Sequence, residues 1–156
     1  AQLVKILIDL QAKGAGRLDL NPLLELAKSL KVHADALEKG AARLRQKCKG
    51  MKDGEIYKRY SALLGSVNEH LMRASRDINP VLYTVSGRFD QDPAEATSLF
   101  PGLQPIAALA NLNSESSEHR FLHTRLAREM NRAADALTHA QRRLHEASQR
   151  VSGALS

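Results

Sequence analysis

The chain has 156 residues, the length of a single domain, which is enough to bury a hydrophobic core without disulfides or metal ions. Only 4% of the residues are aromatic and Trp is absent, which argues against a sheet-rich core, whereas abundant Ala, Leu, Arg, Lys, Glu and Gln favour long helices. The net charge is +6, and the lone Cys48 excludes an intramolecular disulfide, so we expect an intracellular compartment, cytoplasmic or nuclear.

No segment of the sequence is typical of a membrane span or a secretion signal. The longest uncharged run, 96–114, contains two prolines and is neither apolar nor regular enough to cross a bilayer. The N-terminal stretch carries Lys5 and Asp9 and lacks the layout of a signal peptide. Because the chain begins with Ala1 and not Met, we expect it to be a part or a processed form of a longer protein.

Two helix starts are visible near the N-terminus. Residues 1–13 place apolar side chains on one helical face, which predicts a short helix, and the glycines at 14–16 end it. Asn21 followed by Pro22 is typical of an N-cap with proline at the first helical position, where the missing N–H costs nothing. A long helix is therefore expected to begin at Pro22.

The helix expected over residues 22–51 carries a heptad pattern. Its apolar residues follow steps of four and three, and a row of large side chains alternates with a row of small ones, which is typical of close packing against a neighbouring helix. Gly40 lies beside this seam and costs on the order of 1 kcal/mol relative to Ala in a helix interior. The pattern comprises Leu23, Ala27, Leu30, Ala34, Leu37, Ala41, Leu44, Cys48 and Met51.

The next segment predicts the second arm of a helical hairpin over 22–78. Gly50 and Gly54 favour a turn between two arms, although one continuous or kinked helix is an alternative reading. The second arm should end before Pro80, because the proline ring pushes the preceding residue out of the α region. Its apolar stripe comprises Ile56, Tyr60, Leu64, Val67, Leu71, Ala74 and Ile78, broadened by Leu63.

Residues 79–117 predict an irregular connection with short helices. Residues 80–87 are compatible with either a helix or an extended piece, whereas Asp92 opens a capping box for one short helix. Gln104 and the proline after it begin another short helix, and the polar residues 113–118 offer caps for the last helix. The segment is too apolar for a disordered linker, so we expect it to fold over the bundle.

The long C-terminal helix, expected over 118–152, repeats the alternation of large and small apolar rows. We therefore predict that it packs antiparallel against the helix over 22–51, and that the chain is one all-α domain, an antiparallel bundle of coiled-coil-like helices with an irregular middle segment. The packing seam should contain Leu30, Ala34, Leu37, Ala41, Leu44, Met130, Ala133, Leu137, Ala140 and Leu144.

Few residues suggest chemistry. His119 and His123 lie four residues apart on a helix, a spacing that can bind a metal ion, but the sequence assigns no third ligand. Cys48 occupies the small row of a seam, which favours a buried structural thiol over a nucleophile. We therefore expect no catalytic residue, no metal and no cofactor.

A run of cationic residues without an intervening acid lies at the end of the helix over 22–51. Such a surface attracts nucleic acid or another anionic partner. The scarcity of aromatic residues, the lack of a helix-turn-helix signature and the spread of these charges around the helix argue against nucleic acid. The run comprises Lys39, Arg43, Arg45, Lys47, Lys49 and Lys52.

The heptads offer more apolar surface than one internal seam needs, and spare apolar surface invites a partner helix. The sequence therefore predicts a non-enzymatic protein-interaction or scaffolding module, a subunit or domain of a larger assembly. Its partners are expected to be other protein chains, a homo-oligomer among them. The alternative is a nucleic-acid-binding helical domain that uses the cationic run over 39–52.

Overall fold

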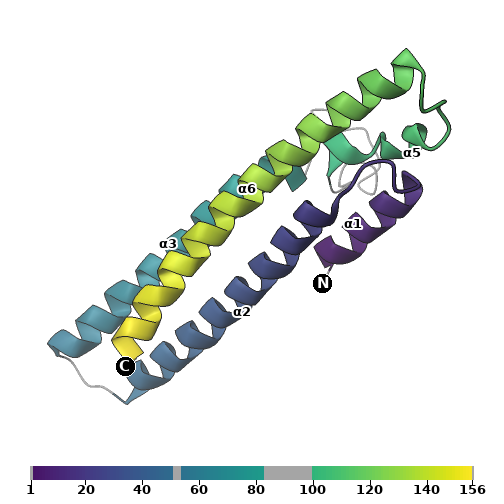
Figure 1. Ribbon diagram of the computed structural model, residues 1–156. Helices are drawn as coiled ribbons and strands as arrows, with labels where there is room; N and C mark the ends of the chain where they lie inside the picture. The colour runs from purple at the N-terminus through teal and green to yellow at the C-terminus, as the bar shows by residue number, and fades with distance from the viewer. Residues whose placement is uncertain (1, 51–53, 83–99, 156) are drawn as a thin grey trace, which may run out of the picture. The chain divides into compact units, whose positions relative to one another are not determined.

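The computed structural model describes residues 2–50, 54–82 and 100–155, and Figure 1 shows these residues as helices joined by turns. No strand occurs among these residues, which confirms the prediction of an all-α bundle for the described part of the chain. None of the described helices is both long and apolar enough to cross a membrane. The elements are α1 (Gln2–Lys13), α2 (Asn21–Lys49), α3 (Glu55–Leu82), the 3₁₀ turn η1 (Pro101–Leu103), α5 (Ile106–Leu109) and α6 (Ser117–Leu155).

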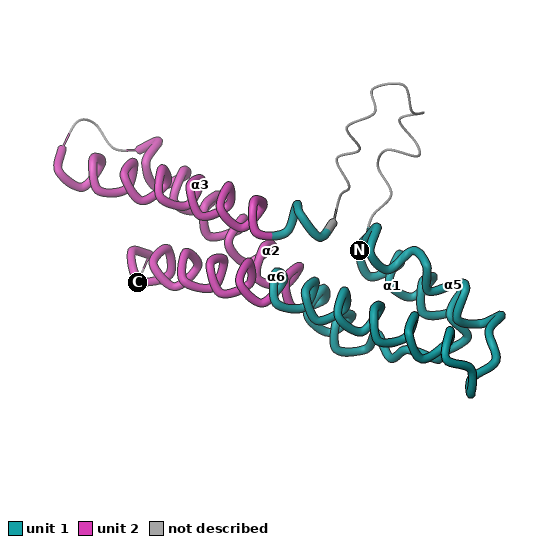
Figure 2. Tube along the Cα trace, turned by 90° about the horizontal axis from the view of Figure 1, so that it is seen from above, with its two compact units in different colours: residues 1–28, 78–137 teal, residues 29–77, 138–156 magenta. Residues whose placement is uncertain are grey.

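The chain divides into two compact units, coloured separately in Figure 2. Unit 1 contains residues 1–28 and 78–137, and unit 2 contains residues 29–77 and 138–156. The helices α2, α3 and α6 each contribute residues to both units. The expectation of one domain over the whole chain stays a prediction.

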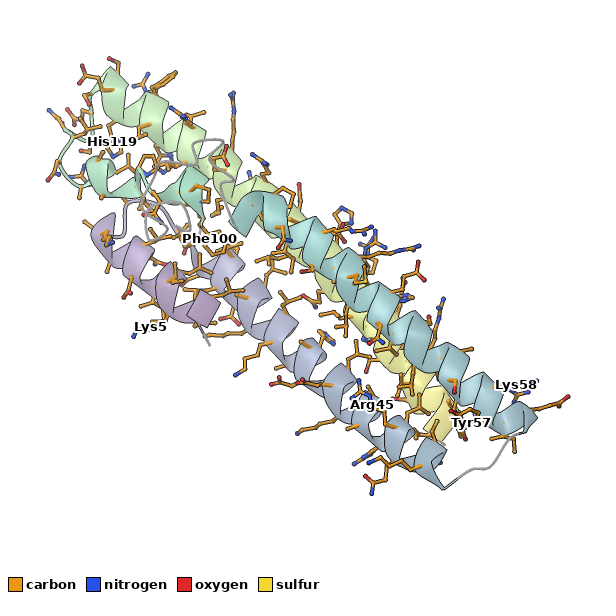
Figure 3. All side chains as sticks on the ribbon, turned by 180° about the vertical axis from the view of Figure 1, so that it is seen from behind. Lys5, Arg45, Tyr57, Lys58, Phe100 and His119 are labelled. Carbon is orange, nitrogen blue, oxygen red and sulfur yellow. The ribbon has the colours of Figure 1, made fainter. Side chains whose placement is uncertain are left out.

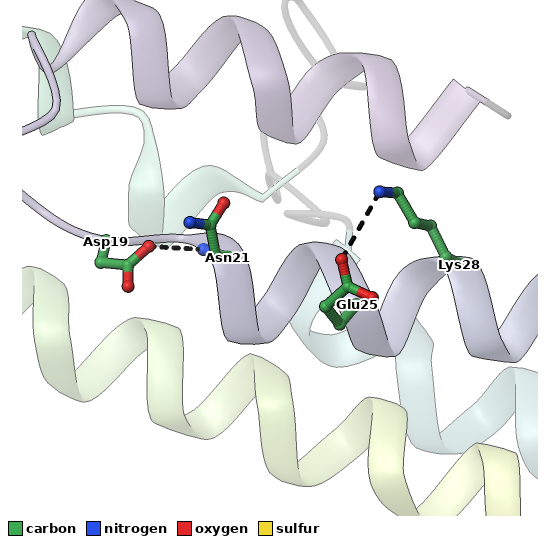
Figure 4. A network of polar contacts seen from close by, with 4 residues as sticks. All are labelled: Asp19, Asn21, Glu25 and Lys28. Atoms are coloured by element: carbon green, nitrogen blue, oxygen red, sulfur yellow. Dashed lines mark hydrogen bonds and ion pairs between the residues drawn. The ribbon is translucent and has the colours of Figure 1, made fainter.

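Polar groups around Asn21 set the start of α2. The Asn21 N–H donates to Asp19 Oδ1 at 2.9 Å (Figure 4). The Leu24 N–H donates to the Leu20 carbonyl. Asn21, which was predicted as the N-cap, is the first residue of the helix. The Asp19 carboxylate satisfies its N–H, which has no partner within the helix. Such a shift of one residue is common at helix ends. The nearby Lys28–Glu25 pair is exposed on both sides and contributes little to stability.

The cap of α6 confirms the role predicted for residues 113–118. Ser116 precedes the helix, and its Oγ accepts a hydrogen bond from the His119 N–H at 3.1 Å. This bond satisfies one of the donors that a helix N-terminus leaves unpaired. Three hydrogen bonds to Asn113 hold the preceding turn: its Oδ1 accepts from the Glu115 N–H, and its carbonyl accepts from the hydroxyl and the N–H of Ser116.

The boundaries of α3 confirm one prediction and correct another. Because α2 ends at Lys49 and the Gly54 carbonyl accepts the Lys58 N–H at the start of α3, the two arms are separate helices and not one continuous helix. The predicted end before Pro80 is wrong, since α3 runs to Leu82. Pro80 lies in the last turn, so the helix loses one i→i−4 hydrogen bond near its end and is not broken in its interior.

In unit 1, the end of α1 lies directly against α5. A Cβ atom on Gly14 would meet Ile106 Cγ1 at 2.8 Å, so the glycine permits the close approach. The Arg17 guanidinium donates to the carbonyls of Leu109 and Leu112, at and beyond the C-terminal end of α5. Arginine thus adds a donor to two carbonyls near a helix C-terminus, one of which, the Leu109 carbonyl, also accepts the Leu112 N–H. The apolar core of unit 1 contains Leu7, Leu10, Leu18, Leu20, Leu23, Leu24, Ala27, Phe100, Leu103, Ile106, Leu109, Leu126, Ala133 and Leu137.

In unit 2, α3 and α6 run in opposite directions. Tyr60 Oη donates to the Ala154 carbonyl at 3.4 Å, and Arg143 Nε donates to Asp77 Oδ2 at 2.6 Å. The residue near the start of α3 thus contacts the end of α6, and the residue near the end of α3 contacts an earlier part of α6. Both ends of this antiparallel pair within unit 2 are tied by polar contacts.

The helices α2 and α6 run parallel in unit 2, which makes the predicted antiparallel pairing wrong. The rings of His33 and His145 meet edge to face with centroids 5.2 Å apart. Further along both helices, a Cβ atom on Gly40 would lie 2.8 Å from Val151 Cγ1. Heptad spacing reads the same in both directions, so it could not reveal the orientation. The orientation follows from α3, which is antiparallel to α2 in the hairpin and antiparallel to α6. Because both helices run opposite to α3, α2 and α6 run parallel to each other.

The loss of the Arg17 hydrogen bonds should destabilise unit 1. We expect Arg17→Met, which keeps most of the aliphatic stem, to lower the free energy of unfolding by about 1–3 kcal/mol. Chemical denaturation measures this change. Arg120→Met is the matched control, because Arg120 is exposed, and it should change stability by less than about 0.5 kcal/mol. Equal effects of the two substitutions would contradict the role given to Arg17.

The contact between Gly40 and Val151 gives a test of the parallel register. Gly40→Ala alone should bring no stabilisation, because its Cβ would clash with the valine methyl. In a Val151→Ala background, the same substitution should stabilise by about 1 kcal/mol through helix propensity. A double-mutant cycle by urea denaturation measures the coupling. Additive effects would show that these two residues do not meet.

Candidate interaction surface

An apolar hollow of about 260 Å³ lies between α2 and α3 within unit 2, and we call it the α2–α3 groove. Its lining comes from two helices that turn back on each other, and so from segments far apart in the sequence. The lining residues are Ala34, Leu37, Glu38, Ala41 and Arg45 of α2, and Val67 and Leu71 of α3.

The groove has a buried floor and an open wall. Leu37, Ala41 and Val67 are 1%, 3% and 2% exposed, so they belong to the packed core. Leu71 is 42% exposed although it is a large apolar residue. Ala34, the other small residue of α2 in the lining, lies one heptad before Ala41 and is half-buried. The small side chains of Ala34 and Ala41 leave space in the groove beside α2.

A row of apolar residues on α3 extends along the groove side. Tyr57, Leu64 and Leu71 are spaced by seven residues and therefore share one helix face. Tyr57 is 37% exposed and Leu64 is half-buried. The adjacent row behaves differently: Val67 is buried, and Tyr60 reaches α6 through its hydroxyl. Helix α6 thus covers one apolar row of α3 and leaves the next one exposed.

The rim of the groove carries one acid and one base from α2. Glu38 and Arg45 are both exposed, and among the described residues neither forms an ion pair. One turn away from Glu38 along the helix stand three alanines and Asp35, so no cation is within reach on its own helix. Arg45 and Tyr57 can be located in Figure 3 on their two helices. Within the described part of the chain, neither rim charge is therefore paired with an opposite charge.

The cationic run predicted from the sequence does not form one surface. Arg45 lines the α2–α3 groove, whereas Arg43 and Lys47 line a separate hollow with Leu155 of α6. Positions 43 and 45 differ by about 200° around an α-helix, which explains the separation. The other members, Lys39 and Lys49, are exposed, and Lys52 lies outside the described residues.

Most of the predicted seam residues are buried, but they do not all face the same neighbour. Ala34 and Ala41 line the α2–α3 groove, whereas Gly40 and His33 provide the contacts of α2 with α6 in unit 2. The predicted packing of large side chains from each of the two seams beside the alanines of the other stays a prediction. Ala34 and Met130 are half-buried, and the buried members are Leu30, Leu37, Ala41, Leu44, Ala133, Leu137, Ala140 and Leu144.

The residues considered for chemistry lie apart from the groove. The rings of His119 and His123 stack with centroids 6.1 Å apart, and no group of three His, Cys, Asp or Glu residues with metal-binding geometry occurs in the described part of the chain. Cys48 is a free thiol. The prediction that it is buried is wrong, since it is half-buried near the end of α2, where the small row reaches the edge of the core.

Sequence reasoning missed several exposed features. Leu71 and Ile56 were placed on the apolar stripe of the second arm, but the stripe did not show which of its residues are exposed, and these two are 42% and 59% exposed. The repeat of Tyr57 with Leu64 at seven residues was a signal for a second row on α3. Glu38 was not singled out because it stands just before the cationic run. The 73% exposed Phe121 of α6, flanked by three arginines in a shallow hollow of unit 1, was also missed.

Comparison of the chain with models of protein families, with curated proteins and with solved structures finds no match. The function is therefore inferred from the residues and contacts of this molecule.

Proposed function

We propose that the chain is a non-enzymatic protein-interaction or scaffolding module that binds a helix in the α2–α3 groove. The observation that supports this function best is the apolar row of α3, in which Leu71 is exposed in the wall of the groove above a buried floor and Tyr57 is exposed on the same helix face. An intracellular setting, cytoplasmic or nuclear, and membership of a larger assembly are parts of the same proposal.

The shape of the groove suits a helix. Two neighbouring antiparallel helices leave a linear furrow, and a third helix packs into it at an interaxial distance of roughly 8–10 Å when small residues line the contact. A docked helix would convert the three-helix arrangement of unit 2 into four helices around a shared apolar centre. Ala34 and Ala41 supply the small residues, and Leu71 supplies an anchor.

The energetics require a contribution from the partner. Complete burial of a Leu or Tyr side chain that is already more than half-buried gains on the order of 1 kcal/mol. Association costs at least about 4 kcal/mol in lost translational and rotational freedom. The exposed row of α3 alone therefore does not suffice, so the occupant must bring apolar side chains of its own that fill the groove between Ala34 and Leu71.

The alternative of a nucleic-acid-binding domain has weaker support. A phosphate backbone is held by cations that follow its track. Here Arg45 stands on the rim of an apolar groove, and Arg43 and Lys47 stand on another side of α2. The cationic run therefore favours protein contacts and solubility over a phosphate track.

A photoreactive side chain tests the groove directly. We expect a probe in place of Asn68, which is exposed and lies about 60° around α3 from Leu71, to form a covalent protein adduct in intact cells. The same probe at the exposed Ala62, about half a turn around the helix from Leu71, should give little adduct. Denaturing electrophoresis of the tagged chain separates these outcomes.

A second variant distinguishes docking from chance proximity. Leu71→Asp should abolish the adduct formed at position 68, because a carboxylate is then buried in an apolar contact. The same change should lower the free energy of unfolding by less than about 1 kcal/mol, because the site is partly exposed in the isolated chain. Equal adducts at positions 68 and 62, or no adduct at either, would refute the proposed function.

A further inference from the structure

The two rim charges of the α2–α3 groove are arranged symmetrically. Glu38 and Arg45 stand seven residues apart on one face of α2, about 10.5 Å along the helix axis. The midpoint between them falls at Ala41 and Ala42, where the side chains are small. Neither charge has an ion-pair partner among the described residues.

This arrangement is complementary to itself in one orientation only. In an interface with twofold symmetry, residue i of one copy meets residue j of the other and the reverse. If two α2 helices cross antiparallel at Ala41 and Ala42, Glu38 of each copy lies opposite Arg45 of the other. A parallel copy would instead place like charges together, which is unfavourable.

The other residues of the groove are also compatible with a second, antiparallel α2 helix. The alanines at the midpoint allow two α2 backbones to approach closely. Each copy also offers the exposed Leu71 and Tyr57, which are the apolar anchors that the energetics demand of a partner. A strongly acidic helix would meet Glu38 on the rim, and a strongly basic helix would meet Arg45. The rim is thus matched to a partner with one charge of each sign.

We propose that the occupant of the α2–α3 groove is a second copy of this chain, docked antiparallel about a twofold axis that passes near Ala41 and Ala42. This inference rests on the proposed function, because it names the partner of the same groove. The copies exchange Glu38–Arg45 ion pairs at the rim and bury Leu71 between them.

Charge exchange at the rim tests this dimer. The variants are Glu38→Arg, Arg45→Glu and the double exchange, and sedimentation equilibrium measures their association. Each single variant places two like-charge pairs across the axis, so we expect its self-association to weaken by about tenfold or more. The double exchange restores opposite pairs and should dimerise like the wild type. An equimolar mixture of the two single variants should form a heterodimer.

Stability serves as the control for these variants. Both side chains are exposed and make no ion pair within the described chain, so each variant should keep its helix content. Its unfolding midpoint should equal that of the wild type when both are measured on the dissociated chain at low concentration, because dimerisation itself raises the midpoint. A lost dimer with an unchanged fold then reports on the interface. The mixed heterodimer adds a positive signal that misfolding cannot produce.

The outcomes separate this inference from the proposed function. If the wild-type chain is monomeric but the probe at position 68 captures a different protein, the second copy is refuted and the groove keeps its function. If a dimer forms and both single variants retain it, the copies meet elsewhere and the inference is refuted. If the chain is monomeric and the probe captures nothing, both proposals fail.

Discussion

In unit 2, three helices share one apolar centre, and three helices cannot cover every apolar row that they carry. Helix α6 lies against α2 at Gly40 and Val151 and against α3 at Tyr60 and Ala154. These contacts bury one row of α3 and leave the neighbouring row open to solvent. The α2–α3 groove exists because of that geometry. Its floor is part of the core, whereas its wall at Leu71 remains exposed, so the features that stabilise the fold also create the surface.

The chemistry of the groove narrows what it can bind. Small residues from α2 allow a backbone to approach, an apolar row from α3 supplies anchors, and the rim presents one acid and one base that form no ion pair among the described residues. None of these groups needs a cofactor or a reacting substrate to explain its place. An exposed apolar row beside unmatched charges is typical of a helix-binding surface. Symmetry of the rim about Ala41 and Ala42 then favours a second copy over an unrelated helix.

Much of the fold could be predicted from the sequence, because periodicity and capping signals are local. The all-α class, the separate arms of the hairpin and the capping role of residues 113–118 were predicted correctly in this way. The direction of α6 along α2 was not, because heptad spacing is the same when read backwards. The end of α3 was misplaced because Pro80 interrupts only the last turn, which continues to Leu82 despite the missing N–H.

The groove itself was beyond sequence reasoning. The pattern showed that α3 is apolar at Leu71, but only the position of α6 decides which row of α3 is covered. Similarly, Arg45 was grouped with its cationic neighbours by proximity in sequence, although helical geometry places it on the same face of α2 as Glu38. Spatial neighbours two turns apart are less conspicuous in a sequence than a run of like charges. The candidate site therefore emerged from combining burial with helix direction.

The most direct measurement is the alkylation rate of a cysteine that replaces Leu71, in a Cys48→Ser background, compared between intact cells and the purified chain at high dilution. If the groove is a docking site, the thiol reacts quickly in the diluted chain and is strongly protected in cells, whereas a cysteine at the exposed Ala62 reacts quickly in both. Equal, rapid reaction at position 71 in both settings would mean that the groove remains open to water, and the account would be wrong.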